Sequence, residues 1–504
     1  MNDLLPSLSL QLSNTIGSLP YFNPEIYLAV LFLLVLVTDL IFGRQSAWIC
    51  RTIAIAGLFI VLFKDLQQIG LLLQHADGSV FLFNNMLLLH KLAVSFKLII
   101  DFFAIILIVY FGLDKRLKEH QKGLSDLYTI VVASVLGLHL MVMSVNLLAV
   151  YLAIEMVSLA SYLLAAYRSE NGFSAEAGLK YVLFGAVASA IMLYGISLLY
   201  SLTGTLGYFD ANLVPGLIAA NPAIVSVAII LTLVGIGFKL SFIPMHFWVP
   251  DVYQGAPTPV TAYLSTLPKI AGFALLINLL TPFVFNTHWV AFDFRLFLSV
   301  IGIITMIAGN FAAVWQKNIK RILAYSSIGH TGFALMAVAT FSQQGVSALT
   351  FYLAVYVFAN IGALMLASYF ADLTGAEDLD AYRGLGLKYP LASVSFVMIL
   401  ISLTGLPVSA GFNGKLLVFS SVYSVYQQNH NIWLLLLMVT GALTTVVSLF
   451  YYIKIPLYLF LKKPAAETEV AETSSANWLL IISFVLALVV LLFGIFPTYL
   501  VGLL

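Results

Sequence analysis

Long apolar runs alternate with short polar or Gly/Pro-rich segments along most of the chain. A helix that crosses the hydrocarbon core of a bilayer needs about 20 predominantly apolar residues, and many of the runs approach or exceed that length. They lie near 26–43, 48–63, 100–113, 128–145, 147–167, 177–201, 223–245, 259–280, 295–315, 319–341, 346–371, 389–426, 432–460 and 477–501. The pattern predicts an all-α polytopic membrane protein with about 14 transmembrane helices.

Two segments depart from this simple pattern. The run 389–426 is too long for one straight span and contains Gly405, Pro407 and Gly411, so we expect one broken helix there. The alternating stretch 80–83 lies in a longer polar loop and predicts a small β-hairpin outside the membrane.

Composition supports a lipid environment, because 62% of the residues are apolar and only 9% are charged. An ordinary soluble domain carries roughly 25% charged residues. These values exclude a soluble enzyme and a disordered scaffold. The net charge of +1 excludes a nucleic-acid partner, since no basic face is available to neutralise phosphates.

The sequence also limits the chemistry of the chain itself. Its one cysteine, Cys50, allows neither an internal disulfide nor an iron–sulfur cluster, and no nucleotide-binding glycine loop is present. We therefore expect no cofactor on this chain and any redox chemistry on partner chains. The first residues lack a basic region, so a cleaved signal peptide is not expected.

The distribution of Lys and Arg predicts the orientation in the membrane. With the amino terminus outside, 15 of the 23 cations fall in inner loops. Only Lys64, Lys91, Lys97 and Arg295 fall in outer loops. Both termini are therefore predicted to be extracytoplasmic.

Four lysines remain, and they lie within apolar runs: Lys239, Lys269, Lys415 and Lys454. Lys454 is near a helix end and can extend its ammonium to the interface. Each of the other three costs about 2.5–3.5 kcal/mol on insertion scales, so such residues usually face a bundle interior and serve a function.

Glu155 is the only acid in its apolar run, and Tyr151, Ser158 and Tyr162 share its helical face. It is either a packing residue that is hydrogen-bonded between helices or a partner that controls the charge of a lysine. Lys239 follows Gly235 and precedes Pro244, which predicts an interrupted helix with free carbonyls at membrane depth.

Further polar residues connect these ionisable groups. Lys269 shares a face with Thr261 and Ser265, and Lys415 follows the second predicted break. Polar stripes at helical spacing include Tyr352, Tyr356 and Asn360 in one run, and Thr440, Thr444, Ser448 and Tyr452 in another. His330 lies beside Ser326, Ser327 and Thr331. Several stripes on different helices indicate a hydrated path through the middle of the protein.

The run FKLSFIPMHFWVPDVYQGAPTPVTAYLSTLPKIAGFALL resembles the antiporter-like membrane subunits of respiratory NADH:quinone oxidoreductase, complex I. Its QGAPTPV and LPKIAGF motifs are most similar to subunit N, and NIKRILAYSSIGHTGF and GLPVSAGFNGKLLVF fit the same family. The likeness covers roughly residues 100–460.

The resemblance implies two inverted five-helix repeats with broken helices at the Lys239 and Lys415 segments. It implies helices 1–3 in residues 1–127, the first repeat in 128–280, the second in 295–460, and a loop with helix 14 in 461–504. Glu155 and Lys239 match the family's glutamate–lysine pair, Lys269 its central lysine and Lys415 its exit-side residue. His330, Lys180 and Tyr356 are possible accessory members of the proton path, although Lys180 also suits an ordinary ion pair with Glu176.

These features predict a proton-translocating subunit in the bacterial inner membrane. Its expected partners are L- and M-like antiporter subunits, small membrane subunits and the lipid bilayer, with NADH, flavin, iron–sulfur clusters and quinone on other chains. The alternatives are an Mrp-like cation/proton antiporter subunit and a membrane subunit of a hydrogenase-like complex.

Overall fold

The computed structural model describes residues 4–503 except 44–45, 76–77, 121–122, 285, 287–288, 290 and 464–473. Two of the predicted inner-loop cations, Arg44 and Lys122, and most of the predicted loop after residue 461 lie outside the described residues.

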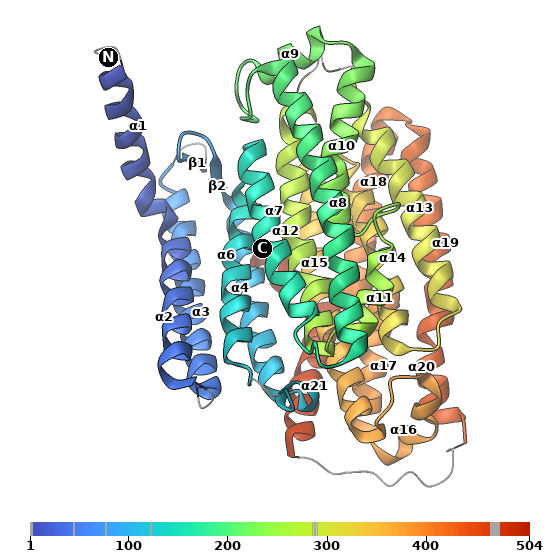
Figure 1. The fold of residues 1–504 in the computed structure, drawn as a ribbon. Helices are drawn as coiled ribbons and strands as arrows, with labels where there is room; N and C mark the ends of the chain where they lie inside the picture. Colours follow the sequence, from blue (N-terminus) through green and yellow to red (C-terminus); the bar gives the residue numbers. More distant parts are fainter. Residues whose placement is uncertain are drawn as a thin grey trace.

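The described chain is a bundle of helices that run roughly along one direction (Figure 1). The helices are α1 Leu4–Ser18, α2 Asn23–Phe42, α3 Ala47–Leu72, α4 Lys91–Leu113, α5 Lys115–Lys118, α6 Ser125–Met143, α7 Leu147–Ala165, α8 Gly172–Thr203, α9 Leu213–Ala219, α10 Pro222–Leu240, α11 Trp248–Gly255, α12 Thr258–Val284, α13 Phe294–Val314, α14 Ile319–Val338, α15 Gln343–Thr374, α16 Leu385–Lys388, α17 Pro390–Thr404, α18 Ala410–Asn429, α19 Ile432–Tyr452, α20 Lys454–Pro456, α21 Ser474–Ile495 and α22 Pro497–Leu503. Short 3-10 or π segments lie at Leu19–Phe22 (η1), Leu379–Tyr382 (η3) and Leu457–Leu461 (η4).

Twelve helices among the described residues are long and apolar enough to cross a membrane. The bundle further contains α14 and the interrupted pair α17–α18. The prediction of an all-α membrane protein is confirmed, whereas the count of fourteen spans stays a prediction. The most buried helix is α15, which lies at the centre of the bundle and contacts α12, α14, α18 and α21.

The predicted hairpin is also confirmed. Strand β1, Ser79–Leu82, pairs antiparallel with β2, Leu87–His90, and Ser79 lies opposite His90. The hairpin lies near the amino terminus at one end of the bundle, which we call the hairpin end (Figure 1). We call the other end, where α16 and α20 lie, the opposite end.

The boundary predicted for the third span was wrong. Helix α4 begins at Lys91, nine residues before the predicted run 100–113. Lys97, which was assigned to an outer loop, is therefore inside a helix, and its side chain is completely buried. The error has a physical reason: Lys97 is paired with buried acids, so its charge does not mark the end of the apolar helix.

Two halves of the bundle repeat the same local features. Asn146 caps α7 and bridges to Gly207, just as Asn318, 172 residues later, caps α14 and bridges to Asp378. The helices that follow them, α8 and α15, are both 32 residues long and end at left-handed glycines, Gly204 and Gly375. α9, which follows α8, is at the hairpin end, whereas α16, which follows α15, is at the opposite end (Figure 1). The repeats are therefore inverted, as predicted.

Both predicted helix breaks are present. Helix α10 ends at Leu240, where Ser241 has a left-handed φ of 59°, and α11 starts at Trp248. Helix α17 ends at Thr404, where Gly405 has φ 83°, and α18 starts at Ala410. Each break interrupts the ladder of backbone hydrogen bonds inside the bundle, so side chains must bind the freed carbonyls.

Candidate functional site

The first part of the site lies between α7 and α10. Lys239 is in the last turn of α10, is 2% exposed, and donates to Oγ of Ser158 on α7 at 3.2 Å. Glu155 is one helical turn before Ser158, and its Oε1 atom is buried without a hydrogen-bond partner among the described residues. The face predicted for Glu155 therefore meets Lys239 through Ser158.

The second part is centred on Lys269 of α12, which is 3% exposed. Its ammonium has three acceptors on α14: the Ser327 carbonyl at 3.0 Å, the Ser327 hydroxyl at 2.7 Å and the Thr331 hydroxyl at 3.0 Å. Thr331 in turn donates to the Leu240 carbonyl at 2.9 Å, next to Lys239. Thr331 thus links the two lysines across the two repeats.

Tyr356 and His330 extend this chain of polar groups. The Tyr356 hydroxyl donates to Ser327 at 2.8 Å, and its ring centroid is 5.0 Å from that of His330. His330 is in hydrogen-bond contact with the Tyr352 hydroxyl through Nδ1 at 2.6 Å and with the Tyr452 hydroxyl through Nε2 at 3.2 Å. The structure therefore brings both predicted accessory residues, His330 and Tyr356, onto the line between Lys269 and Lys415.

The third part surrounds Lys415 of α18, which is 7% exposed. Its Nζ donates to the Thr404 carbonyl at 2.7 Å and lies 5.5 Å from the centre of the Phe333 ring. A cavity of about 20 Å³ is lined by polar groups that include His330, Tyr352 and Lys415. A polar cavity of this size has room for one water molecule. One water would connect the imidazole with the ammonium.

Lys180 lies apart from this line. Its ammonium pairs with Glu176 at 2.8 Å and with Asp251 at 2.7 Å, and all three side chains are at least one-third exposed. Arg321 also binds Asp251, at 2.8 Å. The ion pair that the sequence predicted for Lys180 and Glu176 is therefore present within α8, and the additional pair between Lys180 and Asp251 joins α8 to α11.

A second ionic network lies at the opposite end. Glu377, just after α15, accepts from Arg116 at 2.5 Å and lies 3.3 Å from Lys320. Burial alone would raise the pKa of Glu377, but Lys320 and Arg116 hold it below its ordinary value. These residues border a pocket of about 300 Å³, whose lining includes Gln254 and Gly255 of α11. The pocket therefore borders the carboxyl end of α11, the second segment of the first broken helix.

The candidate residues chosen from the sequence, Glu155 and the buried lysines, omit a second group of buried ionisable side chains. Helices α2, α3, α4 and α6 also bury Glu25, Asp65, Lys97, Asp101 and His139. The spacing of Lys97 and Asp101, four residues apart in an apolar run, was a signal that the sequence contained. The predicted run 100–113 begins after Lys97 and so separates the two residues, whereas both lie on α4.

Comparison with known proteins gives the family of the chain. Residues 144–445 match the family described as NADH:quinone oxidoreductase/Mrp antiporter, transmembrane. The chain is 38% identical over 453 residues to NADH-quinone oxidoreductase subunit N of Chlorobium chlorochromatii, with coverage of 89% of this chain and 86% of that protein. It is 39% identical over 485 residues to subunit N 2 of Chloroherpeton thalassium, with coverage of 95% and 92%.

Solved structures agree with this assignment. A chain of respiratory complex I from Thermus thermophilus with bound aureothin has a TM-score of 0.77 and 29% identity, over 95% of this chain and 98% of that chain. A chain of the Mrp complex from a Dietzia species has a TM-score of 0.78 at 20% identity, over 96% of both chains, and shows that the fold is shared. The chain belongs to the NADH:quinone oxidoreductase/Mrp antiporter transmembrane family, and its similar relatives include subunit N proteins over nearly their whole length.

Proposed function

We propose that this chain is the proton-translocating subunit N of an NADH:quinone oxidoreductase complex. NADH oxidation and quinone reduction take place on partner subunits, and this chain moves protons in response. The observation that carries the proposal is the line of three buried lysines, joined by hydroxyl groups and an imidazole across both repeats. Buried ionisable residues inside membrane bundles commonly mark ion pathways.

The proposed path runs from Glu155 through Lys239 and Lys269 to Lys415. When the Glu155 carboxylate is close, it stabilises the charged form of Lys239, and when it is withdrawn, the desolvated ammonium releases its proton. Ser158 and Thr331 orient the donors between Lys239 and Lys269. Tyr356, His330 and the water-sized cavity connect Lys269 with Lys415.

A change in the proton affinity of a buried lysine can supply the energy needed to move one proton across the membrane. Moving one charge across 100 mV takes about 2.3 kcal/mol. A tenfold change in the proton affinity of a lysine corresponds to about 1.4 kcal/mol, so a change of about two orders of magnitude is sufficient for each proton.

Subunit position and orientation complete the proposal. The chain is an integral membrane protein and assembles with other membrane subunits, among them L- and M-like antiporter subunits. We propose the bacterial inner membrane, with both termini extracytoplasmic, because the cations of the sequence concentrate in alternate loops. We also propose residues 128–280 and 295–460 as the two functional repeats.

Lys269 provides the decisive experiment, because it lies in the first proposed repeat and binds α14 of the second. Lys269→Ala should allow assembly on native gels but strongly reduce proton uptake into vesicles that contain the complex. Lys269→Arg should also be impaired, because Arg retains its proton. Lys317→Ala, a change at an exposed lysine before α14, is the matched control. Normal pumping by Lys269→Ala in assembled complex would contradict the proposal, and sodium-driven proton exchange without NADH would favour the antiporter alternative.

A further inference from the structure

Five ionisable side chains meet inside the amino-terminal helices, away from the lysine path. Glu25 comes from α2, Asp65 from α3, Lys97 and Asp101 from α4, and His139 from α6. All five are completely buried. We call this group the amino-terminal cluster.

Lys97 is saturated with acceptors. Its Nζ atom lies 2.6 Å from Oε1 of Glu25, 2.7 Å from Oδ1 of Asp65 and 2.7 Å from Oε1 of Gln68. An ammonium has three donors and no acceptor, so these three contacts use all of its hydrogens. The geometry therefore fits a charged Lys97.

His139 contacts carboxylates through both ring nitrogens. Nδ1 is 3.1 Å from Oε1 of Glu25, and Nε2 is 3.0 Å from Oδ1 of Asp101. Oδ2 of Asp65 also approaches Nε2, at 4.0 Å. A neutral imidazole donates from only one nitrogen, so contacts with carboxylates on both sides favour the charged form.

The charges of the cluster do not balance. Three carboxylates face two cations, which leaves a net charge of −1 in a completely buried site. An uncompensated charge in such a place is very unfavourable, and one additional proton removes it. Acceptors for that proton are present, because Glu25, Asp65 and Asp101 each have a buried carboxylate oxygen without a hydrogen-bond partner among the described residues.

Most of the ionisable groups on the neighbouring elements are bound to groups outside the cluster. On α12, Lys269 donates to α14, and Tyr263 contacts Ser134. Tyr21 of η1 contacts His75, and His90 of β2 contacts the Leu88 carbonyl. On α15, Tyr352 contacts His330, and Tyr356 donates to Ser327. On α7, Glu155 lies one turn from Ser158, the partner of Lys239. Helix α21, which packs on α4, contributes no acidic or basic side chain. The proton balance is therefore set by the five cluster residues themselves.

We propose that the amino-terminal cluster is a second proton-binding site, which holds one exchangeable proton on the pair Asp65 and Asp101 beside His139. The site is distinct from the lysine path of the proposed function, and the proposal does not depend on that function. Asp65 and Asp101 are the natural location because both carboxylates face the same imidazole nitrogen.

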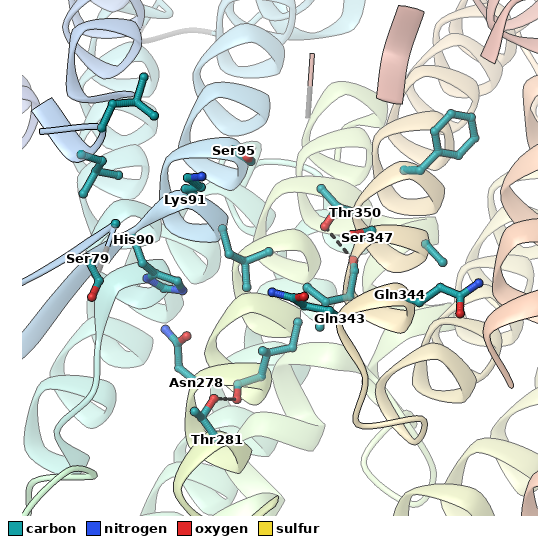
Figure 2. Close-up of a pocket in the computed structure, with 18 of the residues that line it drawn as sticks. Ser79, His90, Lys91, Ser95, Asn278, Thr281, Gln343, Gln344, Ser347 and Thr350 are labelled. Carbon is teal, nitrogen blue, oxygen red and sulfur yellow. Dashed lines mark hydrogen bonds between the residues drawn. The ribbon is translucent and has the colours of Figure 1, made fainter. Parts of the chain in front are cut away.

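A route for exchange lies at the hairpin end. A pocket of about 920 Å³ is bordered by β1, β2, α4, α12 and α15, and polar side chains such as Ser95, Asn278 and Gln343 surround it (Figure 2). Its lining includes His75 and Leu72, and Leu72 lies one helical turn after Gln68, which accepts from Lys97 of the cluster. Gln68 donates to the Tyr21 carbonyl at 2.7 Å, and the Tyr21 hydroxyl contacts His75 at 2.9 Å. The lining of the pocket is thus connected with the cluster through His75, Tyr21 and Gln68.

A metal ion is the competing ligand, since ligand atoms of Glu25, Asp65 and His139 lie within 4.8 Å of one another. The Lys97 ammonium, however, already lies between Glu25 and Asp65 at 2.6 and 2.7 Å. It occupies the position that a cation would take, so the geometry favours a proton over a metal.

Infrared spectroscopy of the purified complex tests the proposal through the carbonyl band of a protonated carboxyl group. This band should shift in D₂O and should be lost in both Asp65→Asn and Asp101→Asn, because two acids then balance two cations. The matched control is Asp39→Asn. Asp39 is on α2 but lies outside the cluster and accepts from Ser46, so this variant should keep the band. The double variant Glu25→Gln with Lys97→Met should also keep it, since two acids then face only His139.

Retention of the band in both Asn variants would overturn the proposal. A stoichiometric metal, found by elemental analysis of the wild-type complex and lost in Asp65→Asn, would overturn it in favour of a metal site. Failure of both Asn variants to assemble would also contradict it, because these clusters are neutral without an extra proton. A complex that does not pump but retains the predicted band pattern would refute the proposed function and leave this site standing.

Discussion

The two helix breaks use their lysines in different ways. At the first break, Lys239 precedes the interruption and donates to Ser158 on a neighbouring helix. At the second break, Lys415 follows the interruption and donates to the carbonyl of Thr404, the last residue of α17. The two lysines do not occupy equivalent positions in the two repeats. The caps Asn146 and Asn318 are 172 residues apart, and the same offset makes Gly411, not Lys415, the position equivalent to Lys239.

The backbone carbonyls that each break leaves free accept hydrogen bonds from different donors. The Leu240 carbonyl accepts from Thr331 at 2.9 Å and from Ser241 at 2.6 Å, so the first break needs no lysine for its stability. The Thr404 carbonyl accepts from the Lys415 ammonium itself. In the proposed path, proton transfer and helix capping are therefore separate at the first break and combined in one residue, Lys415, at the second.

The largest expected effect is a loss of pumping at the first break. Lys239→Met should lower the pumping rate by about 100-fold or more, the usual loss when a positioned proton donor is removed. The thermal midpoint of the complex should stay close to wild type, because the break keeps Thr331 and Ser241 as caps. Proton uptake into vesicles and a melting curve of the same preparation measure both quantities. A large fall in the midpoint would show that Lys239 also stabilises the break.

At the second break, the same substitution should affect stability as well. Lys415→Met leaves the Thr404 carbonyl without its charged donor and should cost about 1.5–3 kcal/mol, the range for hydrogen bonds to charged groups. Lys415→Arg should recover much of that stability but not pumping, because Arg keeps its proton. Melting curves of the three forms compare them directly. Equal melting midpoints for Lys415→Met and wild type would remove the distinction between the two breaks.

The sequence predicted much of this arrangement because broken helices and buried lysines leave local signals. Gly405 and Pro407 identify the second break, and the polar face of Tyr352 and Tyr356 follows from helical spacing. The sequence could not predict the hydrogen-bond partners of these residues. Lys269 binds Ser327 because α12 packs against α14, and the two residues are 58 positions apart in the sequence.

The contacts within the amino-terminal cluster could not be predicted from the sequence either. Glu25, Asp65 and His139 lie on three separate helices. Glu25 and Asp65 fall just outside the predicted runs 26–43 and 48–63, and His139 is surrounded by apolar residues within 128–145, so none of them indicates a partner when taken alone. Helix packing places Glu25 and Asp65 next to Lys97. The apolar runs, taken one at a time, predict a loop position for Lys97 because they contain no information about this packing.

A backbone change at the second break should have the next largest effect. Gly405 has φ 83°, and a Cβ atom there would lie 2.6 Å from Cδ of Lys415. Gly405→Ala should therefore cost about 1–2 kcal/mol from the left-handed conformation and displace the ammonium as well. Gly204→Ala is the matched control, since Gly204 has φ 70° and no atom near its Cβ position. The control should lower the melting midpoint without reducing pumping; equal pumping in the two variants would contradict the close contact with Lys415.

The smallest expected effect concerns the cap of the first break. Thr331→Val removes the hydroxyl that donates to the Leu240 carbonyl and accepts from Lys269. The carbonyl keeps Ser241 and the lysine keeps Ser327, so the loss should be that of a single net hydrogen bond, about 0.5–1.5 kcal/mol. Pumping should fall moderately, because Thr331 is the group that links Lys239 with Lys269. Thr331→Ser retains the hydroxyl and should restore pumping, whereas a pumping rate for Thr331→Val equal to that of wild type would mean that protons pass between the two lysines by another route.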